Sequence, residues 1–235
     1  MERIPEIEVI GESVDVERYN QIMGRGMVMR EYRHLARRAA GLLPAEQAVK
    51  ALDVGTGPGF VAIEIARLLP PGSRVTGLDL SAAMLDSAGK NAAQAGLSEM
   101  MDWKEGDAAR MPFPDNSFDL ITSSGSLHHW ENPPAVFDEM ARVLRPGGAL
   151  VVRDSRRLQP ARRLQPNGST LLARLIGWTL PADFRKHYWN SIRASYTLEE
   201  VGLLLAESKL KGACLEQDEL DLMIVIDPQV HTWNK

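Results

Sequence analysis

One short stretch, from Leu52 to Phe60, constrains the fold more than any other part of the chain. It reads Leu-Asp-Val-Gly-Thr-Gly-Pro-Gly-Phe, with a strand-length run before it (residues 48–54) and apolar residues at helical spacing after it, until Pro70. Strand, glycine turn and helix in this order predict the mouth of a parallel sheet in a doubly wound α/β fold. Glycines let the backbone approach a ligand closely, and the helix offers its first N–H groups at the same point.

The glycine spacing and an acid in the turn indicate the kind of ligand. A dinucleotide fingerprint places its third glycine three positions after the second, whereas Gly57 is followed directly by Pro58 and Gly59. Asp53 at the strand end would repel a pyrophosphate but suits a cation. The series Asp53-x-Gly55-x-Gly57-x-Gly59 resembles motif I of the class I S-adenosylmethionine-dependent methyltransferases. That resemblance implies a cofactor that carries an ammonium and a sulfonium group, with these four residues around it.

A second expected strand, residues 73–81, ends in another acid. Asp79 lies 79 − 59 = 20 positions after the third glycine, where a carboxylate can accept hydrogen bonds from both hydroxyls of a ribose. Methyltransferases similarly place an acid at the end of their second strand. The alternative is that Asp79 caps the helix that begins near Ala82, which Ser81 could do equally well.

A third motif follows the third expected strand, residues 101–107. Gly106-Asp107-Ala108 and the Pro-Phe and Ser-Phe-Asp series up to residue 119 resemble the adenine-binding segment of small-molecule methyltransferases. The resemblance implies that the Asp107 side chain accepts from the exocyclic amine of adenine and that the Ala108 N–H meets a ring nitrogen. It also implies that Leu80 and Met84 belong to the cofactor site, with Met84 against the adenine.

The loop after the fourth expected strand, residues 118–123, is where chemistry is expected, because ligands of doubly wound sheets lie beyond the carboxyl ends of the strands. The resemblance implies that Ser124 offers its backbone to the methionine part of the cofactor. His128 and His129 are adjacent candidates for a general base, since an imidazole can accept a proton at neutral pH, but they could equally pack the loop. Trp130 could form a wall of the acceptor pocket or fill the core.

The remaining strands complete a Rossmann-like sheet of seven. Leu144 to Gly148, Leu-Arg-Pro-Gly-Gly, is typical of the family and predicts a tight reversal before a fifth strand at 149–153. Thr197-Leu-Glu-Glu200 predicts a capping box that opens a helix. Residues 212–219 and 220–226 predict a closing antiparallel strand pair, which the methyltransferase sheet has and the dinucleotide fold lacks.

Two regions outside these motifs bear on the acceptor. Residues 1–45 are expected to form a helical N-terminal cover, either packed on the sheet or acting as a lid from which Tyr19 reaches the ligand. In the family, the insertion that corresponds to residues 155–196 commonly roofs the acceptor. Tyr188 and Trp189 are therefore candidate pocket walls, although plain packing explains them equally well.

The same insertion carries Arg-Arg-Leu-Gln-Pro twice, at residues 156–160 and 162–166. The simplest interpretation is a solvated basic stretch. An alternative is a clamp for an anionic acceptor, since arginine matches phosphate and carboxylate in bidentate fashion. Contact with a partner or a membrane surface is a third possibility.

Composition sets the outer bounds. The 235 residues, with 44% hydrophobic and 25% charged, fit a single domain over residues 1–235. A net charge of −4 argues against nucleic-acid binding. The single cysteine, Cys214, excludes internal disulfides, and together with the absence of a signal-peptide pattern it predicts a cytoplasmic protein. No apolar run approaches the length that stable membrane insertion requires.

The expected function is transfer of a methyl group from S-adenosylmethionine to oxygen, nitrogen or carbon of a small metabolite, leaving S-adenosylhomocysteine. Holding donor and acceptor in line contributes roughly 7–11 kcal/mol, so no nucleophile motif and no metal are expected. The Asn-Pro-Pro-Tyr signature of amino methylation is not present, because Asn132-Pro133-Pro134 is followed by Ala135. The alternative is a protein of the same fold that binds this cofactor but runs another reaction, or an inactive binding subunit.

Overall fold

The computed structural model of the chain describes residues 3–5, 16–157, 180, 182–217 and 220–230. Its centre is a seven-stranded sheet in the order β3-β2-β1-β4-β5-β7-β6. The strands are β1 (Lys50–Val54), β2 (Arg74–Asp79), β3 (Met101–Glu105), β4 (Phe118–Ser124), β5 (Leu144–Ser155), β6 (Cys214–Gln217) and β7 (Asp221–Ile226). Neighbouring strands from β3 to β5 are parallel, and β7 is antiparallel to both β5 and β6. The expected doubly wound sheet with a closing antiparallel pair is confirmed.

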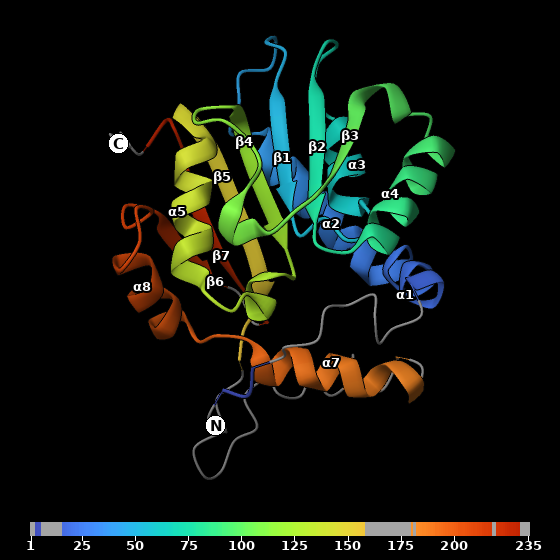
Figure 1. Cartoon of the computed structure of the whole chain (residues 1–235), viewed down its shortest axis with the longest axis vertical. Coiled ribbons are helices and arrows are strands. Elements are labelled where there is room, and N and C mark those ends of the chain that lie inside the picture. The colour runs from blue at the N-terminus through green and yellow to red at the C-terminus, as the bar shows by residue number, and fades with distance from the viewer. Residues whose placement is uncertain (1–2, 6–15, 158–179, 181, 218–219, 231–235) are drawn as a thin grey trace.

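Helices cover both faces of this sheet (Figure 1). They are α1 (Val16–Met23), α2 (Gly26–Ala40), α3 (Phe60–Ala66), α4 (Ala82–Gln94), α5 (Pro133–Val143), α7 (Ala182–Ala194) and α8 (Leu198–Ala206), with short 3₁₀ turns η1 (Ser98–Met100), η2 (Ala108–Arg110) and η3 (Leu127–His129). Helices α5 and α8 lie on one face, and α2, α3 and α4 lie on the other.

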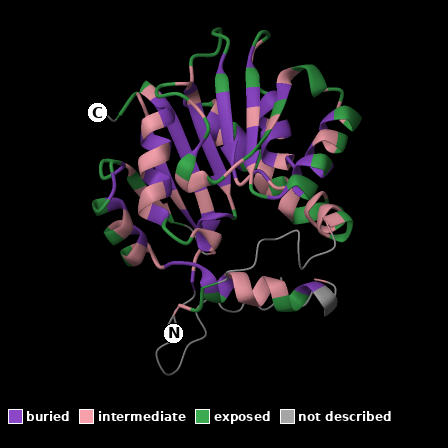
Figure 2. Cartoon of the chain, viewed as in Figure 1, coloured by how far each residue is buried: buried purple, intermediate pink, exposed green. Residues whose placement is uncertain are grey.

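Each face of the sheet has its own apolar core because strand side chains alternate between the faces. In β5, Leu150 and Val152 join the core under α5 and α8, whereas Ala149 and Val151 join the core under α2 and α3. Figure 2 shows the strands buried along most of their length, with exposed residues on the outer sides of the helices. Burial of each leucine-sized side chain between sheet and helix contributes about 1.5–3 kcal/mol to the stability of the fold.

Helix boundaries follow their local capping residues. The Ser81 hydroxyl accepts from the Met84 N–H at 3.3 Å and caps α4, so Asp79 does not fill that role. Gly96 follows the C-terminal end of α4 with φ of +70°, a conformation that favours glycine. Thr197 and Glu200 form the expected capping box at α8, with each side chain accepting from the other residue's N–H.

The Leu-Arg-Pro-Gly-Gly segment corrects one expectation. Leu144 already pairs with Phe118 of β4, and the pairing resumes where Leu120 lies opposite Ala149. The segment between is therefore an irregularity within β5 rather than a reversal before it. Gly147, with φ of +74°, and Gly148, where a Cβ would lie 3.0 Å from the Asp119 carbonyl oxygen, allow the strand to resume beside β4.

The described part of residues 1–45 contains the helices α1 and α2, which are joined at Gly24–Gly26. Helix α7 lies across the end of the sheet toward which β1, β2 and β4 run (Figure 1). Residues 158–179 of the expected insertion, with the second Arg-Arg-Leu-Gln-Pro copy, lie outside the described residues. Among the helices that are described, none is long and apolar enough to cross a bilayer.

Candidate active site

A cavity of about 430 Å³ opens at the carboxyl ends of β1, β2 and β4. It is lined by twelve of the residues that the sequence proposed for the site: Tyr19, Asp53, Gly55, Gly57, Asp79, Leu80, Met84, Asp107, Ala108, Ser124, His129 and Trp130. Four others, Gly59, His128, Tyr188 and Trp189, are not among its lining residues. The doubly wound rule therefore located the cavity, but it did not separate the residues that line it from those that support it.

The three glycines of the turn have different surroundings, although all have positive φ. A Cβ at Gly57, which lines the cavity, would meet no atom within 4 Å. A Cβ at Gly55 would lie 2.2 Å from the Ser126 hydroxyl, and one at Gly59 would lie 2.9 Å from the Ala88 Cβ. Gly57 thus leaves room for a ligand, whereas Gly55 and Gly59 allow close packing against the loop and α4.

Asp53 is buried at the end of β1, with 2% of its surface exposed. Its carboxylate accepts from the Thr56 hydroxyl at 2.7 Å and from the Thr122 hydroxyl at 2.8 Å. Burial raises the pKa of Asp53 to about 6, and the two threonine hydrogen bonds oppose this shift only in part. The buried carboxylate therefore gains from any cationic group that enters the cavity.

Asp79, at the end of β2, faces the glycine turn. One carboxylate oxygen accepts from the Gly57 N–H at 2.7 Å and the other from the Ser81 N–H at 2.9 Å. These bonds fix the orientation of the carboxylate, and burial raises its pKa despite them. Each oxygen keeps capacity to accept a further hydrogen bond from a ligand hydroxyl.

Asp107 begins the 3₁₀ turn η2. Its side chain accepts from the Ala109 N–H at 2.8 Å, and its carbonyl oxygen accepts from the Arg110 N–H at 3.0 Å. On the other side, the Gly106 N–H donates to the Asp79 carbonyl oxygen at 3.0 Å. The turn that carries Asp107 is thus joined directly to the strand end that carries Asp79.

The charge of the lining is one-sided. Carboxylates of Asp53, Asp79, Asp107 and Glu131 reach the cavity, and no lysine or arginine lines it among the described residues. Such a cavity disfavours a pyrophosphate and favours a cationic or neutral ligand. Among the residues that the structure describes, no cluster of histidine, cysteine and acidic side chains is arranged to hold a metal ion.

The two histidines of η3 have different surroundings. His129 is half-buried and lines the cavity, while His128 is 4% exposed and is not a lining residue. The Nδ1 atom of His128 lies 2.7 Å from Oδ1 of Asp154, and the His128 N–H donates to Oδ2 at 3.1 Å. The two imidazole rings lie 4.1 Å apart between centroids. His128 is therefore held by Asp154 and packs against His129, and it is not among the residues that line the cavity.

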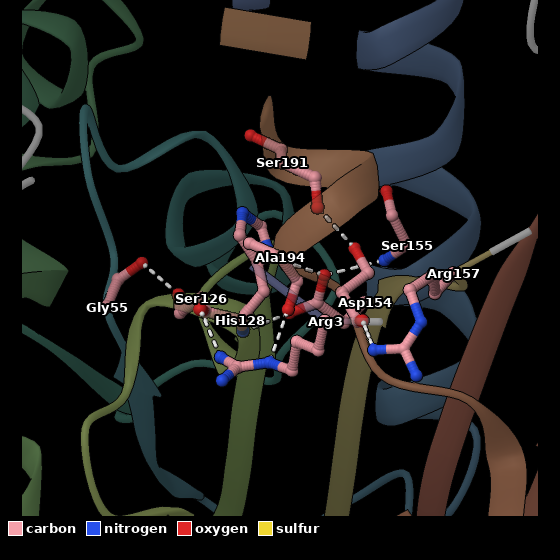
Figure 3. A network of polar contacts seen from close by, with 10 residues as sticks. Arg3, Gly55, Ser126, His128, Asp154, Ser155, Arg157, Ser191 and Ala194 are labelled. Atoms are coloured by element: carbon pink, nitrogen blue, oxygen red, sulfur yellow. Dashed lines mark hydrogen bonds and ion pairs between the residues drawn. The ribbon is translucent and has the colours of Figure 1, made fainter. Parts of the chain in front are cut away.

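Arg3 ties this loop to the C-terminal end of α7 (Figure 3). Its guanidinium donates to the His128 carbonyl oxygen at 3.1 Å and to the Ala194 carbonyl oxygen at 2.6 Å, and lies 4.0 Å from the ring centroid of Tyr196. Arg157 holds the same junction from the sheet side, through the Ser195 carbonyl oxygen at 3.2 Å and an ion pair with Glu200. The first arginine pair of the duplicated motif thus includes one buried structural residue.

The aromatic candidates also divide. Tyr19 lines the cavity and contacts Phe184 of α7, with 5.8 Å between ring centroids. Trp130 also lines it, and its ring packs edge-on to that of Phe137. Tyr188 and Trp189 instead pack with Ile192 and Leu220 in a small apolar cluster on α7. The structure thus places these two in packing contacts and not among the residues that line the cavity.

Residues 52–152 match the family described as "Methyltransferase domain". The match begins at β1 and ends in β5, so it contains the glycine turn and all three strand-end acids. Over these residues, which are less than half of the chain, the sequence is that of a methyltransferase domain. The strand order of the sheet agrees with this assignment, as does the antiparallel β7.

Relatives of this methyltransferase domain act on diverse molecules. The chain is 37% identical over 120 residues to the 27-O-demethylrifamycin SV methyltransferase of Amycolatopsis mediterranei, covering 51% of this chain and 43% of that protein. It is 39% identical over 103 residues to the ubiquinone/menaquinone biosynthesis C-methyltransferase of Roseobacter denitrificans, covering 44% and 41%. The chain thus spans less than half the length of these two curated relatives.

A solved structure extends the likeness of the fold beyond this segment. The S-adenosylmethionine-dependent methyltransferase of Aquifex aeolicus superposes with a TM-score of 0.63 at 18% identity, covering 91% of this chain and 98% of that one. At this identity the comparison supports the fold alone.

Sequence reasoning missed several residues of the methyltransferase cavity. Tyr32 of α2 and Phe60 of α3 both line it, with their rings stacked at 6.2 Å between centroids. Burial raises the pKa of Tyr32 to about 12, so its hydroxyl stays protonated and can donate to a ligand. The signal was present in part, because Tyr32 belongs to the apolar face of the N-terminal cover, but nothing in the sequence aimed it at the glycine turn.

Proposed function

We propose that this chain binds S-adenosylmethionine in the cavity and transfers its methyl group to a small-molecule acceptor. The observation that carries the proposal is that one cavity gathers the open side of Gly57 and three strand-end carboxylates, with no basic side chain among its described lining residues. A cofactor with a sulfonium and an ammonium group fits this charge, whereas a dinucleotide does not.

The residues divide into three groups around the cofactor. Asp79 would accept from the ribose hydroxyls, because its oxygens are already oriented by Gly57 and Ser81. Asp107 and the Ala108 N–H would bind adenine, with Leu80 and Met84 beside it. Gly55, Gly57 and Ser124 would hold the methionine part, and the charge of Asp53 would favour its ammonium group. Gly59 would act indirectly, by packing α3 close to α4.

When bound, S-adenosylmethionine supplies a methyl group that its sulfonium already makes electrophilic. The chain then has to orient the acceptor, exclude water and take a proton. We assign proton acceptance to His129, because it lines the cavity, and the support of His129 to His128 and Asp154. Orientation can contribute roughly 7–11 kcal/mol, which makes the walls as important as the base.

The acceptor side is assigned to Tyr19, Trp130 and His129. Helices α1 and α7 meet there through Tyr19 and Phe184, so residues 1–45 and the 155–196 insertion would shield the acceptor from water. The two curated relatives described above are named for a rifamycin and for C-methylation in ubiquinone/menaquinone biosynthesis, which supports a small-molecule acceptor methylated on oxygen or carbon. The net charge of −4 disfavours a nucleic-acid acceptor.

We place the activity in the cytoplasm. The chain has one cysteine, Cys214, which is exposed and free, so no internal disulfide stabilises the fold. A fold of this kind suits a reducing compartment.

Calorimetric titration with S-adenosylhomocysteine tests the binding step. The wild-type protein should bind, and Asp79→Asn should weaken binding about 100-fold, since a charge-assisted hydrogen bond contributes about 1.5–3 kcal/mol. Asp86→Asn, on an exposed position of α4, is the matched control and should bind as wild type. Absence of wild-type binding would refute the cofactor assignment.

Methyl-labelled S-adenosylmethionine tests the transfer step. Incubation with fractionated metabolites should move label into a small molecule, and His129→Ala should slow that transfer. Binding without transfer to any fraction would instead favour a different reaction or a binding subunit.

A further inference from the structure

The turn that carries Asp107 and Ala108 is held by hydrogen bonds at both ends. The side chains that hold its second end belong to residues that do not line the cavity. Upstream, the Gly106 N–H is bonded to the Asp79 carbonyl oxygen. Downstream, the turn leads directly into Met111, whose side chain is 4% exposed. Both backbone polar groups of Met111 are bound by side chains of α5.

Glu139 and Arg142 make these contacts. The Met111 N–H donates to Glu139 Oε2 at 2.7 Å, and Arg142 Nη2 donates to the Met111 carbonyl oxygen at 3.0 Å. Arg142 also donates through Nη1 to the Phe113 carbonyl oxygen at 2.7 Å and to Asp115 Oδ1 at 2.9 Å. One guanidinium therefore holds three residues of the loop that follows the adenine-binding turn.

Arg142 and Glu139 are themselves held together. Arg142 Nε lies 2.7 Å from Glu139 Oε1, and Nη2 lies 2.7 Å from Oε2, which is a bidentate pair on one turn of α5. Their side chains are 27% and 18% exposed. The hydrogen bonds with Arg142 lower the pKa of Glu139, and those with Glu139 raise the pKa of Arg142, so both groups stay charged at neutral pH.

We propose that Arg142 and Glu139 are positioning residues for adenine recognition: from α5 they clamp Met111 and so hold Asp107 and Ala108 where the 6-amino group and a ring nitrogen of adenine can be read. The proposal rests on the proposed function, because it assigns the clamp to the adenine end of that cofactor site. A loop that is held only at its Gly106 end would let Asp107 shift, and selectivity for adenine would fall before the fold is lost.

The test compares two ligands on the same protein. S-Adenosylhomocysteine carries the 6-amino group, and S-inosylhomocysteine carries a 6-oxo group that cannot donate to Asp107. The wild-type protein should bind the first at least about tenfold more tightly by calorimetry, because the second leaves a carboxylate without its donor. Arg142→Gln should weaken S-adenosylhomocysteine about tenfold and compress the ratio between the ligands to about threefold or less.

Arg145→Gln is the matched control. Arg145 lies three residues further along, has the same charge and bonds Asp119 at 2.5 Å and the Asn116 carbonyl oxygen at 3.2 Å, but it makes none of the Met111 contacts. It should keep the wild-type ratio. Thermal melting of each variant, with binding measured well below the transition, separates selectivity from stability.

Two further variants keep the test decisive if Arg142→Gln does not fold. Arg142→Lys keeps the positive charge but loses the planar guanidinium that makes several hydrogen bonds at once. Glu139→Gln keeps the size of the side chain but weakens both the pair with Arg142 and the hydrogen bond from the Met111 N–H. Each variant should therefore lower the affinity ratio between the two ligands in part. Unchanged ratios in all folded variants overturn the positioning role while leaving cofactor binding intact. Failure of the wild-type protein to bind either ligand overturns the proposed function and this inference together.

Discussion

Asp154 and His128 form a buried ion-pair geometry, with Nδ1 of His128 2.7 Å from Oδ1 of Asp154, although 26 residues separate them in sequence. They meet because β5 pairs with β4 in parallel, with Arg153 opposite Ser124, so that Asp154 ends beside the loop that carries η3. Asp154 also accepts from the backbone N–H groups of His128 and Ser155. The histidine loop is therefore anchored to β5 as well as to its own strand.

Asp154→Asn should destabilise the fold by about 1–3 kcal/mol, because an amide offers one acceptor oxygen where the carboxylate offers two and leaves a buried donor poorly matched. Urea unfolding at pH 7 measures the loss. Asp86→Asn on the exposed side of α4 is the control, and an equal result for the two variants would contradict the anchoring role.

His129→Ala should reduce turnover by about 10²–10⁴-fold, the usual range for loss of a general base. S-Adenosylhomocysteine affinity should change by no more than about threefold, since the assigned role concerns the acceptor. The measurement is label transfer to whichever metabolite accepts the methyl group. His34→Ala, at an exposed position of α2, serves as control. Unchanged turnover in His129→Ala removes the proton-acceptor role.

Gly57→Ala should mainly weaken ligand binding, whereas Gly59→Ala should mainly lower the stability of the fold. At Gly57 the new methyl group is added to a residue that lines the cavity, so S-adenosylhomocysteine affinity should fall at least about tenfold while stability drops by about 1–2 kcal/mol from left-handed strain. At Gly59 the methyl group meets Ala88 at 2.9 Å and Trp103 at 2.8 Å, so stability should fall further, by about 1–3 kcal/mol beyond the strain.

Gly96→Ala isolates the strain. Its φ is +70° and no atom lies within 4 Å of the new Cβ, so it should lose the strain energy alone and bind ligand normally. Calorimetric binding and urea unfolding of all three variants give the comparison. Equal losses of affinity at Gly57 and Gly96 would argue against a ligand at the glycine turn.

Asp53 predicts a specific pH dependence of stability. Its pKa is raised from 3.8 to about 6 by burial, so its favourable contribution is complete below about pH 4 and is lost as pH rises through 6. A shift of this size corresponds to about 3 kcal/mol. The free energy of unfolding of wild type relative to Asp53→Asn should therefore fall by an amount of that order between pH 4 and pH 7, and a flat difference would contradict the buried, ionisable assignment.

The sequence predicted the frame of the molecule because its signals are local. Asp79 and Asp107 lie where a strand ends and turn residues follow. Thr197 and Glu200, three residues apart, predict the start of a helix. The order of glycine turn, second acid and third acid then placed these groups at one edge of the sheet. Those inferences needed only periodicity and the rule that parallel strands present their carboxyl ends together.

The parts that were missed depend on directions of side chains from distant segments. Thr122 reaches Asp53 from β4, and Trp103 of β3 covers the faces that Gly59 and Gly77 leave open. The contact between Asp154 and His128 could be anticipated in part, because the end of β5 must lie next to the end of β4. The sequence did not say in which direction the Asp154 side chain points. Leu144 pairs with β4 because a strand irregularity, invisible in periodicity, lets β5 begin early.

The contacts of Arg3 have a practical consequence. One side chain near the start of the sequence bridges the histidine loop and the end of α7, so a fusion partner or affinity tag attached beside it would disturb the two hydrogen bonds that join these elements. Kinetic comparisons between preparations should therefore be made on protein from which such an extension has been removed, or with the extension attached elsewhere.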